Sequence, residues 1–203
     1  MISLSAFARL PTEFGEFTLQ SFDGFADGRD HLAMIFGDLP VEDVLVRMHS
    51  ECLTGEVFGS RRCDCQSQLN DALRTIAANG AGVLLYLRQE GRGIGLKNKL
   101  RAYELQDDGM DTVEANRALG FKDDERDFSI AGDMLKALNI KSVKLMTNNP
   151  DKIYALTDAD IMVTRVPSLA CVRADHADYL QAKADKMGHM IPQEILESLK
   201  KKA

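Results

Sequence analysis

Apolar and polar positions alternate in several short segments of the chain, which predicts a fold rich in β-strands. Alternation at every second residue is typical of a half-buried strand, and a short continuous apolar run is typical of a strand buried on both faces. The run GVLLYL is the clearest case of the second kind. The pattern predicts strands at residues 16–22, 31–37, 44–49, 82–87, 144–147 and 161–166.

Between these strands, apolar positions recur three or four residues apart, which predicts amphipathic helices. Residues 66–79 give the clearest example, and Gly80 provides a stop signal. Asp111 and Glu114 have the spacing of a capping box that opens a short helix, which Gly120 ends. The apolar face of the first helix comprises Leu69, Ala72, Leu73, Ile76 and Ala77. Further helices are expected at about 94–106, 130–138, 178–187 and 193–201.

The order of these elements favours an α+β fold (mixed α/β) over a purely parallel wound sheet. Strands dominate the first fifty residues, and strands and helices alternate afterwards. With 203 residues and 45% hydrophobic content, the chain can bury a sizeable core. We therefore expect residues 1–203 to form a single domain, a mixed sheet flanked by helices, with a helical segment at about 170–203.

Composition and charge narrow the classes of function. The net charge of −6 argues against general binding to a nucleic acid backbone, so any anionic ligand must be held by a local cluster of basic residues. The first residues, MISLSAFARLPTEFGEF, lack the basic and apolar regions of a secretory signal. No apolar run has the length of a membrane span. We therefore expect no membrane association and a reducing, cytoplasmic location.

Three of the four cysteines lie close together, as Cys52, Cys63 and Cys65. Zinc favours thiolate ligands, and three protein ligands leave a fourth tetrahedral position open, as in a catalytic site. The spacing C-x10-C-x-C therefore predicts a hydrolytic metal site with three thiolates, while Cys171 lies far away. Two other interpretations stay open, namely cysteines buried as small hydrophobic residues and a disulfide pair.

A glycine-rich segment, residues 88–96 (RQEGRGIGL), lies between the predicted strand GVLLYL and the next helix. Backbone N–H groups of such a turn, together with a helix N-terminus, can approach an anion. The segment is neither a Walker loop nor G-x-G-x-x-G. Glu90 lies between two arginines and could accept the paired donors of a guanine edge. The alternative is an exposed turn with ordinary charges.

Two further polar segments are candidates for ligand binding. Residues 123–127 (DDERD) form a charge run, for which a solvated turn that caps the next helix is the simpler interpretation. Residues 147–152 (TNNPDK) follow a predicted strand, and strand ends often carry ligand contacts. Thr147 and Lys152 could hold phosphate oxygens there, or cap the following helix.

Four segments in order resemble GTP cyclohydrolase II, the enzyme family that begins riboflavin synthesis. The resemblance runs from about residue 44 to 152 and resumes at ADKMGH near the C-terminus. The dihydroxybutanone phosphate synthase domain that is sometimes fused ahead of this one is missing, so we expect the stand-alone form. The matching segments are RMHSECLTGEVFGSRRCDC, RQEGRGIGLKNKLRAYELQDDGMDTVEAN, DERDF and LMTNNPDK.

The resemblance implies a reaction and a role for each matching residue. GTP would be hydrolysed at guanine carbon 8, releasing formate and pyrophosphate and giving 2,5-diamino-6-hydroxy-4-(5-phosphoribosylamino)pyrimidine. Cys52, Cys63 and Cys65 would bind one Zn²⁺ per chain, and Mg²⁺ would accompany the triphosphate. A homodimer is implied. Asp124 would be the proton acceptor, Arg126 the nucleophile toward the α-phosphorus, and Tyr103 a residue of the ring chemistry. The GTP-contacting positions would be Arg47, Met48, His49, Ser50, Glu51, Gln68, Glu90, Gly91, Arg92, Thr112, Thr147 and Lys152.

Physical chemistry leaves two of these roles open. An arginine stays protonated in proteins, so Arg126 could instead be a charge clamp on the α-phosphate, oriented by Asp124. Tyr103 shares a helical face with Leu96 and Leu100, so it could be a core tyrosine with an anchored hydroxyl.

Other functions also stay open. His49-Ser-Glu51 has the H-x-E spacing of zinc nucleobase deaminases, but those enzymes need P-C-x-x-C downstream, where this chain has C-x-C. A deaminase would release ammonia instead of formate. A zinc-stabilised nucleotide-binding module would return GTP unchanged, and a diverged relative would retain the formyl group or the pyrophosphate.

The chain departs from the family pattern beyond Val166. The stretch from Pro167 to Lys183 contains no asparagine and has Ala182 where the family usually carries threonine. We expect this divergent segment to affect C-terminal packing or a subunit contact, and to leave the zinc and GTP positions intact.

Overall fold

The protein is described by a computed structural model that covers residues 1–168, 181, 184–185 and 188–192. The chain forms two compact units. The first, called the sheet unit, comprises residues 1–50, 69–88 and 128–168. The second, called the thiol unit, comprises residues 51–68, 89–127 and 169–203. The prediction that residues 1–203 form one domain stays a prediction.

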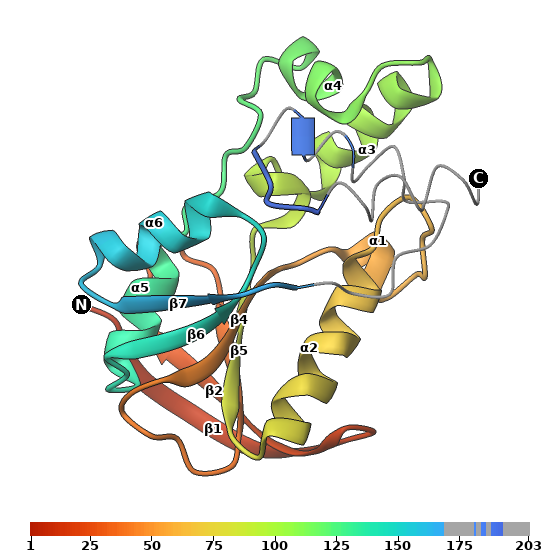
Figure 1. The fold of residues 1–203 in the computed structure, drawn as a ribbon. Helices are drawn as coiled ribbons and strands as arrows, with labels where there is room; N and C mark the ends of the chain where they lie inside the picture. Colours follow the sequence, from red (N-terminus) through yellow and green to blue (C-terminus); the bar gives the residue numbers. More distant parts are fainter. Residues whose placement is uncertain (169–180, 182–183, 186–187, 193–203) are drawn as a thin grey trace. The chain divides into compact units, whose positions relative to one another are not determined.

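The sheet unit is built on one seven-stranded sheet with the order β1-β2-β3-β5-β4-β6-β7 (Figure 1). Pairing is antiparallel from β1 through β2 and β3 to β5, and parallel from β5 through β4 and β6 to β7. The sheet is therefore mixed, as the order of elements predicted. The strands are β1 Ser3–Thr12, β2 Gly15–Asp23, β3 Leu32–Phe36, β4 Val44–Ser50, β5 Gly82–Leu87, β6 Ser142–Met146 and β7 Met162–Val166.

Helices cover both faces of this sheet, and the two cores follow from strand alternation. In β5, Val83 and Leu85 point into the core that α5 and α6 cover, whereas Leu84 points into the core that α2 covers. A strand buried on both faces reads as a continuous apolar run, which is why GVLLYL was recognisable from sequence. The helices are α1 Leu53–Glu56, α2 Cys65–Asn79, α3 Gly95–Asp107, α4 Thr112–Ala118, α5 Ser129–Ala137 and α6 Pro150–Asp158, with a 3-10 turn η1 at Glu90–Gly93.

Most predicted elements are confirmed. All six predicted strands exist, and the helices predicted at 66–79, 94–106 and 130–138 correspond to α2, α3 and α5. The capping box of α4 is present, since the Asp111 carboxylate accepts from the backbone N–H of Glu114, and the Glu114 carboxylate accepts from the backbone N–H of Asp111. The helices predicted at 178–187 and 193–201 fall largely outside the described residues.

Strand β1 was missed for a physical reason. It pairs with β2 along its length, but nine of its ten residues are exposed. A strand exposed on both faces carries no alternation of apolar and polar residues, so periodicity cannot reveal it. No range was predicted for α6 either, although the turn before it was recognised. No helix among the described residues is both long and apolar enough to cross a membrane.

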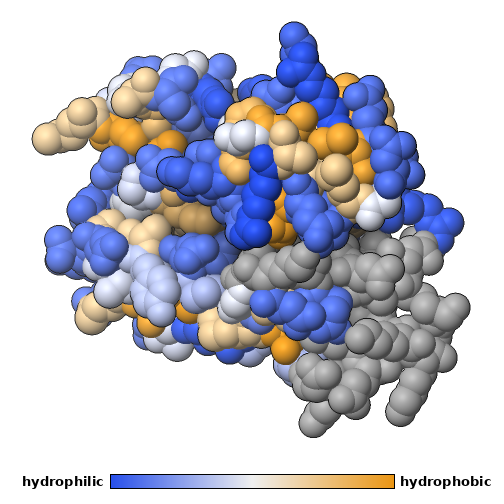
Figure 2. Space-filling view, turned by 90° about the horizontal axis from the view of Figure 1, so that it is seen from above, coloured by the Kyte–Doolittle hydropathy of each residue, from blue (hydrophilic) through white to orange (hydrophobic). Residues whose placement is uncertain are grey.

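The thiol unit is packed differently. Its buried residues include one thiol, three charged side chains and two amide side chains, and few large apolar groups. Large apolar side chains are exposed there at Val57, Phe58 and Leu100. On the face that Figure 2 shows, hydrophobic residues are interspersed with hydrophilic ones.

Candidate metal centre and nucleotide site

The three clustered cysteines come together at the start of the thiol unit. Cys52 precedes α1 and Cys65 is the first residue of α2, while Cys63 lies in the connecting loop. Their Sγ atoms all lie within 4.8 Å of one another, and those of Cys52 and Cys63 are 3.6 Å apart. All three are free thiols. Two sulfurs on one tetrahedral zinc lie about 3.8 Å apart, since each Zn–S bond is about 2.3 Å. The cluster therefore fits a metal ion, and the disulfide interpretation is wrong.

Gly55 in α1 makes room for the cluster. A Cβ atom at this position would lie 2.9 Å from the Sγ of Cys63 and 3.3 Å from the Sγ of Cys52. Real Cβ atoms do not approach sulfur so closely, so any larger residue would displace the thiols. The glycine is visible in the segment C-L-T-G, but its close approach to Cys63, eight positions further along the chain, cannot be predicted from that segment.

Without a metal, the three thiols differ in pKa, so negative charge is favoured on one of them. Hydrogen bonds from the thiols of Cys63 and Cys65 hold the pKa of Cys52 far below its usual range, and the Lys99 ammonium acts in the same direction. The pKa values of Cys63 and Cys65 are raised, first because each donates its proton to Cys52. A thiolate at Cys52 is thus favoured, and a metal that took all three thiolates would release protons.

Lys99 in α3 is the site residue that sequence reasoning missed. Its Nζ atom lies 3.1 Å from the Sγ of Cys52 and 2.7 Å from the Oε1 of Glu90, and its side chain is only 10% exposed. The carboxylate of Glu90 also accepts the backbone N–H of Leu53 at 2.6 Å and that of Gly91 at 2.8 Å. One signal could have indicated Lys99, because it precedes Tyr103 by four residues and shares its helical face.

The glycine-rich segment forms the tight turn η1. Gly91 and Arg92 both have left-handed backbone angles, with φ of 64° and 59°. Gly93 passes so close to the backbone of Glu125 that a Cβ atom would lie 2.7 Å from its carbonyl carbon. Within the turn, the backbone N–H of Gly91 donates to the carboxylate of Glu90, and that of Gly93 donates to the backbone carbonyl of Gln89. These two amides are therefore already hydrogen-bonded within the turn. The group of this turn that could bind an anion is the guanidinium of Arg92.

Tyr103 faces the loop around the cysteines. Its hydroxyl lies 3.3 Å from the Oγ1 of Thr54, and the guanidinium of Arg62 lies 4.7 Å from its ring centre. Burial raises the pKa of Tyr103. Leu96 and Leu100 on the same face are 36% and 49% exposed, so this face is not a core. The interpretation of Tyr103 as a core residue is therefore wrong, although its hydroxyl is anchored.

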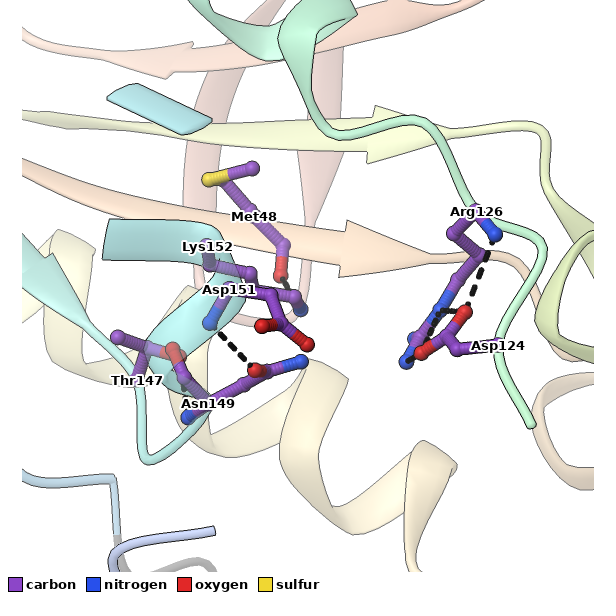
Figure 3. Close-up of polar contacts among 7 residues, drawn as sticks. All are labelled: Met48, Asp124, Arg126, Thr147, Asn149, Asp151 and Lys152. Carbon is purple, nitrogen blue, oxygen red and sulfur yellow. Dashed lines mark hydrogen bonds and ion pairs between the residues drawn. The ribbon is translucent and has the colours of Figure 1, made fainter. Parts of the chain in front are cut away.

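Asp124 and Arg126 form a close ion pair (Figure 3). The guanidinium donates from Nε to the Oδ1 of Asp124 at 2.8 Å and from Nη2 to Oδ2, and the two side chains are 13% and 17% exposed. Burial alone would raise the pKa of Asp124, but the hydrogen bonds and charge of Arg126 lower it overall. The interpretation of this pair as a solvated turn is wrong, whereas the neighbouring pair Arg117–Asp123 is exposed.

In the sheet unit, the predicted GTP-contacting residues Arg47, Met48, His49 and Ser50 are the last four residues of β4. The Nζ of Lys152 donates to the backbone carbonyl of Met48 at 2.8 Å (Figure 3). A guanidinium nitrogen of Arg47 donates to the carbonyl of Met146 at 2.9 Å. Arg47 thus joins the ends of the parallel strands β4 and β6, and Lys152 joins α6 to β4.

The turn after β6 is held by its own side chains. The Asn149 side chain caps α6 by accepting the N–H of Asp151 at 2.8 Å, and the Thr147 hydroxyl accepts the N–H of Asn149 at 3.0 Å (Figure 3). The cap of this helix is therefore Asn149, and neither Thr147 nor Lys152. Both remain candidates for phosphate binding.

The remaining predicted residues are dispersed. Gln68 donates to the carboxylate of Asp64 at 2.6 Å, and Thr112 is the first residue of α4. His49 stacks on Tyr86 with ring centres 5.9 Å apart, and the thiol cluster found among the described residues comprises the three cysteines without it. Glu51 follows β4 directly. Cys171 and Ala182 lie outside the described residues.

Comparison with known proteins adds an independent finding. The family model for GTP cyclohydrolase II matches residues 4–167. A GTP cyclohydrolase-2 of Proteus mirabilis is 56% identical over 186 residues, covering 91% of this chain and 94% of that protein. One from Pseudomonas putida is 56% identical over 191 residues, covering 93% of each. The riboflavin biosynthesis protein RibBA of Bacillus subtilis is 53% identical over 185 residues, covering 90% of this chain and 46% of that protein.

Proposed function

The chain belongs to the GTP cyclohydrolase II family, and from this premise we propose that it hydrolyses GTP at guanine carbon 8 in a zinc-dependent reaction. Formate and pyrophosphate leave, and 2,5-diamino-6-hydroxy-4-(5-phosphoribosylamino)pyrimidine is the product that enters riboflavin synthesis. The observation that carries the proposal is the cluster of Cys52, Cys63 and Cys65, whose sulfur atoms are spaced to bind one ion.

The donor set supports a hydrolytic role for this ion. When bound, zinc supplies a Lewis acid that lowers the pKa of water to about 7. Three thiolates leave one tetrahedral position for water or substrate. Tyr103 orders the loop beside Cys52 through its hydroxyl contact with Thr54. Its hydroxyl can donate to a nitrogen or oxygen of the opening ring, because its raised pKa keeps it protonated at neutral pH.

We assign the binding of GTP to the polar residues that match the family's motifs. We assign the triphosphate, with Mg²⁺ as its counter-ion, to Arg92, Thr147 and Lys152. Glu90 already accepts three N–H groups. A carboxylate has about four acceptor positions, so Glu90 can accept one further donor in this arrangement. The remaining contacts are assigned to Arg47, Met48, His49, Ser50, Glu51, Gln68, Gly91 and Thr112.

The pair Asp124–Arg126 supports a charge clamp on the α-phosphate. Arg126 is already held by the carboxylate, and the ion pair favours its protonated form, which is a poor nucleophile. A lowered pKa makes Asp124 a weak base, which suits a residue that orients a cation. We therefore assign Asp124 to orienting Arg126, and Arg126 to stabilising charge that develops at phosphorus.

One incubation tests the proposal. Zinc-loaded protein is mixed with Mg-GTP, and formate, pyrophosphate, the pyrimidine and ammonia are measured separately. We expect formate, pyrophosphate and pyrimidine in equal amounts. Ammonia without formate would support a deaminase, and unchanged GTP would support a nucleotide-binding module. Pyrophosphate without formate from metal-free protein would show that the two cleavages are separate chemistry.

Two further expectations belong to the same proposal, namely a homodimer and a cytoplasmic location. Light scattering on the purified protein measures the first, and a mass of one chain would contradict it. Cell fractionation measures the second.

A further inference from the structure

Lys99 is an unusual residue in its helix. Of the thirteen residues of α3, only Lys99 and Ala102 are buried. A lysine is rarely buried unless its charge is paired, because the ammonium loses its hydration. The burial of Lys99 therefore indicates that its charge is used.

Its ammonium group joins two parts of the proposed metal site. One contact is with the sulfur of Cys52, and the other is with the carboxylate of Glu90. Glu90 in turn accepts the backbone N–H of Leu53, which follows Cys52 in the chain. Lys99, Glu90 and the Cys52–Leu53 backbone thus form a closed loop of hydrogen bonds around the first cysteine.

The charges of the site explain why a buried ammonium group is favourable there. One divalent cation bound by three thiolates leaves one negative charge in excess, and Glu90 adds another. The ammonium of Lys99 offsets one of them at close range, where the surroundings are poorly hydrated. An N–H donor on a thiolate also reduces the electron density that sulfur gives to a metal, and hydrogen bonds to ligands are a recognised means of tuning such sites.

We propose that Lys99 is a positioning residue of the metal centre, which holds the Cys52 sulfur and the Glu90 carboxylate in one geometry and offsets the charge of the three thiolates. The inference rests on the proposed metal site. It assigns Lys99 no contact with the reacting atoms.

Zinc affinity tests the proposal without any measurement of turnover. Wild-type protein, Lys99→Met and Lys97→Met are stripped of metal and titrated with zinc against a competing chelator. Lys97 lies in the same helix but is exposed, so it is the matched control. Loss of a group that supports a metal ligand costs about 10- to 100-fold in affinity, and we expect this loss in Lys99→Met only. Equal affinities in the two variants would overturn the proposal.

A spectroscopic measurement separates positioning from a merely structural role. Cobalt(II) bound by thiolates has an absorption band in which charge moves from sulfur to metal. Loss of the N–H donor raises the energy of the sulfur electrons, so the band should move to longer wavelength in Lys99→Met. A band at the wild-type wavelength in cobalt-bound Lys99→Met would contradict the contact with Cys52.

The controls distinguish the possible failures. Wild-type protein that binds neither zinc nor cobalt would refute the proposed metal site itself. Wild-type protein that binds both, with Lys99→Met indistinguishable from it, would refute only the role of Lys99. If Lys99→Met does not fold, the same two measurements are made on Lys99→Gln, because glutamine keeps an N–H donor but loses the charge. The zinc affinity of Lys99→Gln should fall below that of the wild type. An unchanged zinc affinity would overturn the proposal.

Discussion

Each of the two units is stabilised internally by a different kind of interaction. Both hydrophobic clusters found among the described residues consist entirely of sheet-unit side chains. The thiol unit instead buries Cys52, Glu90 and Lys99, with small apolar residues such as Ala102 and Ala115. Apolar burial is general and insensitive to the exact partner, whereas thiols and charges need particular partners at particular distances.

This difference indicates where stability and chemistry are located. The sheet unit has a core that would support a fold without any ligand. The thiol unit depends on polar contacts and on whatever the three sulfur atoms bind, so its order should follow metal occupancy. The following substitutions test this division.

The largest effect on stability is expected in the sheet unit. Leu85 in β5 is fully buried in the core formed with α5 and α6. Leu85→Ala should lower the free energy of unfolding by about 2–5 kcal/mol, because it removes apolar contacts and leaves a cavity. Denaturant titration measures this. Zinc affinity measured in the folded fraction should stay near the wild-type value, and a parallel loss of zinc would contradict the division.

The two units should also differ in their effects on catalysis. Arg126→Ala should lower kcat by about 10²–10³, because a cation that stabilises developing charge is lost. Lys152→Ala in the sheet unit should raise KM more than it lowers kcat, because its main role is to bind the triphosphate. Steady-state kinetics of formate release measure both. Near-normal turnover in Arg126→Lys would leave a simple charge clamp as the adequate account, and full activity of Arg126→Ala would remove Arg126 from the mechanism.

A pair of glycine substitutions makes the comparison sharper. A Cβ at Gly132 in α5 would lie 2.5 Å from the Cβ of Ala159, and one at Gly55 would lie 2.9 Å from the Sγ of Cys63. Each alanine variant should cost about 1–3 kcal/mol through overpacking. Gly55→Ala should in addition weaken zinc binding, whereas Gly132→Ala should not. Metal titration of the two variants gives the answer, and equal zinc affinities would contradict the role of Gly55.

The smallest effect concerns acid stability. Arg126 lowers the pKa of Asp124 in the folded protein, so the pair stabilises the fold above the ordinary carboxyl pKa of 3.8. This contribution is lost as pH falls through the lower folded pKa, because the carboxylate then becomes protonated. Asp124→Asn should therefore remove about 1–3 kcal/mol at neutral pH and flatten the decline below pH 3.8.

Asp123→Asn is the control for this effect. Asp123 has a lowered pKa too, first because of its hydrogen bonds with Arg117, but these two side chains are 35% and 65% exposed, far more than Asp124 and Arg126. Exposed ion pairs contribute little, so this variant should change acid unfolding less. Identical pH profiles for the two variants would show that burial of the Asp124–Arg126 pair adds nothing.

The sequence predicted the sheet unit and the thiol unit to different extents. The core strands and helices were predicted because burial leaves a periodic pattern, and β1 escaped because it is exposed. The spacing of Cys52, Cys63 and Cys65 predicted the thiol cluster, because a thiolate site needs a particular residue type. Lys99 and Gly55 could not be found in the same way. Their roles depend on contacts with residues far away in the sequence, which the residue type alone does not indicate. Only the position of Lys99, four residues before Tyr103, pointed toward the site.

The most direct test of the central claim is the zinc content of purified protein, measured together with formate release, for wild type, Cys63→Ser and Cys171→Ser. The account predicts one zinc per chain and formate release from wild type and Cys171→Ser. It predicts loss of both from Cys63→Ser, since removal of one thiolate leaves an incomplete site. Full zinc retention or wild-type formate release by Cys63→Ser would contradict the claim that these three cysteines form the catalytic metal centre.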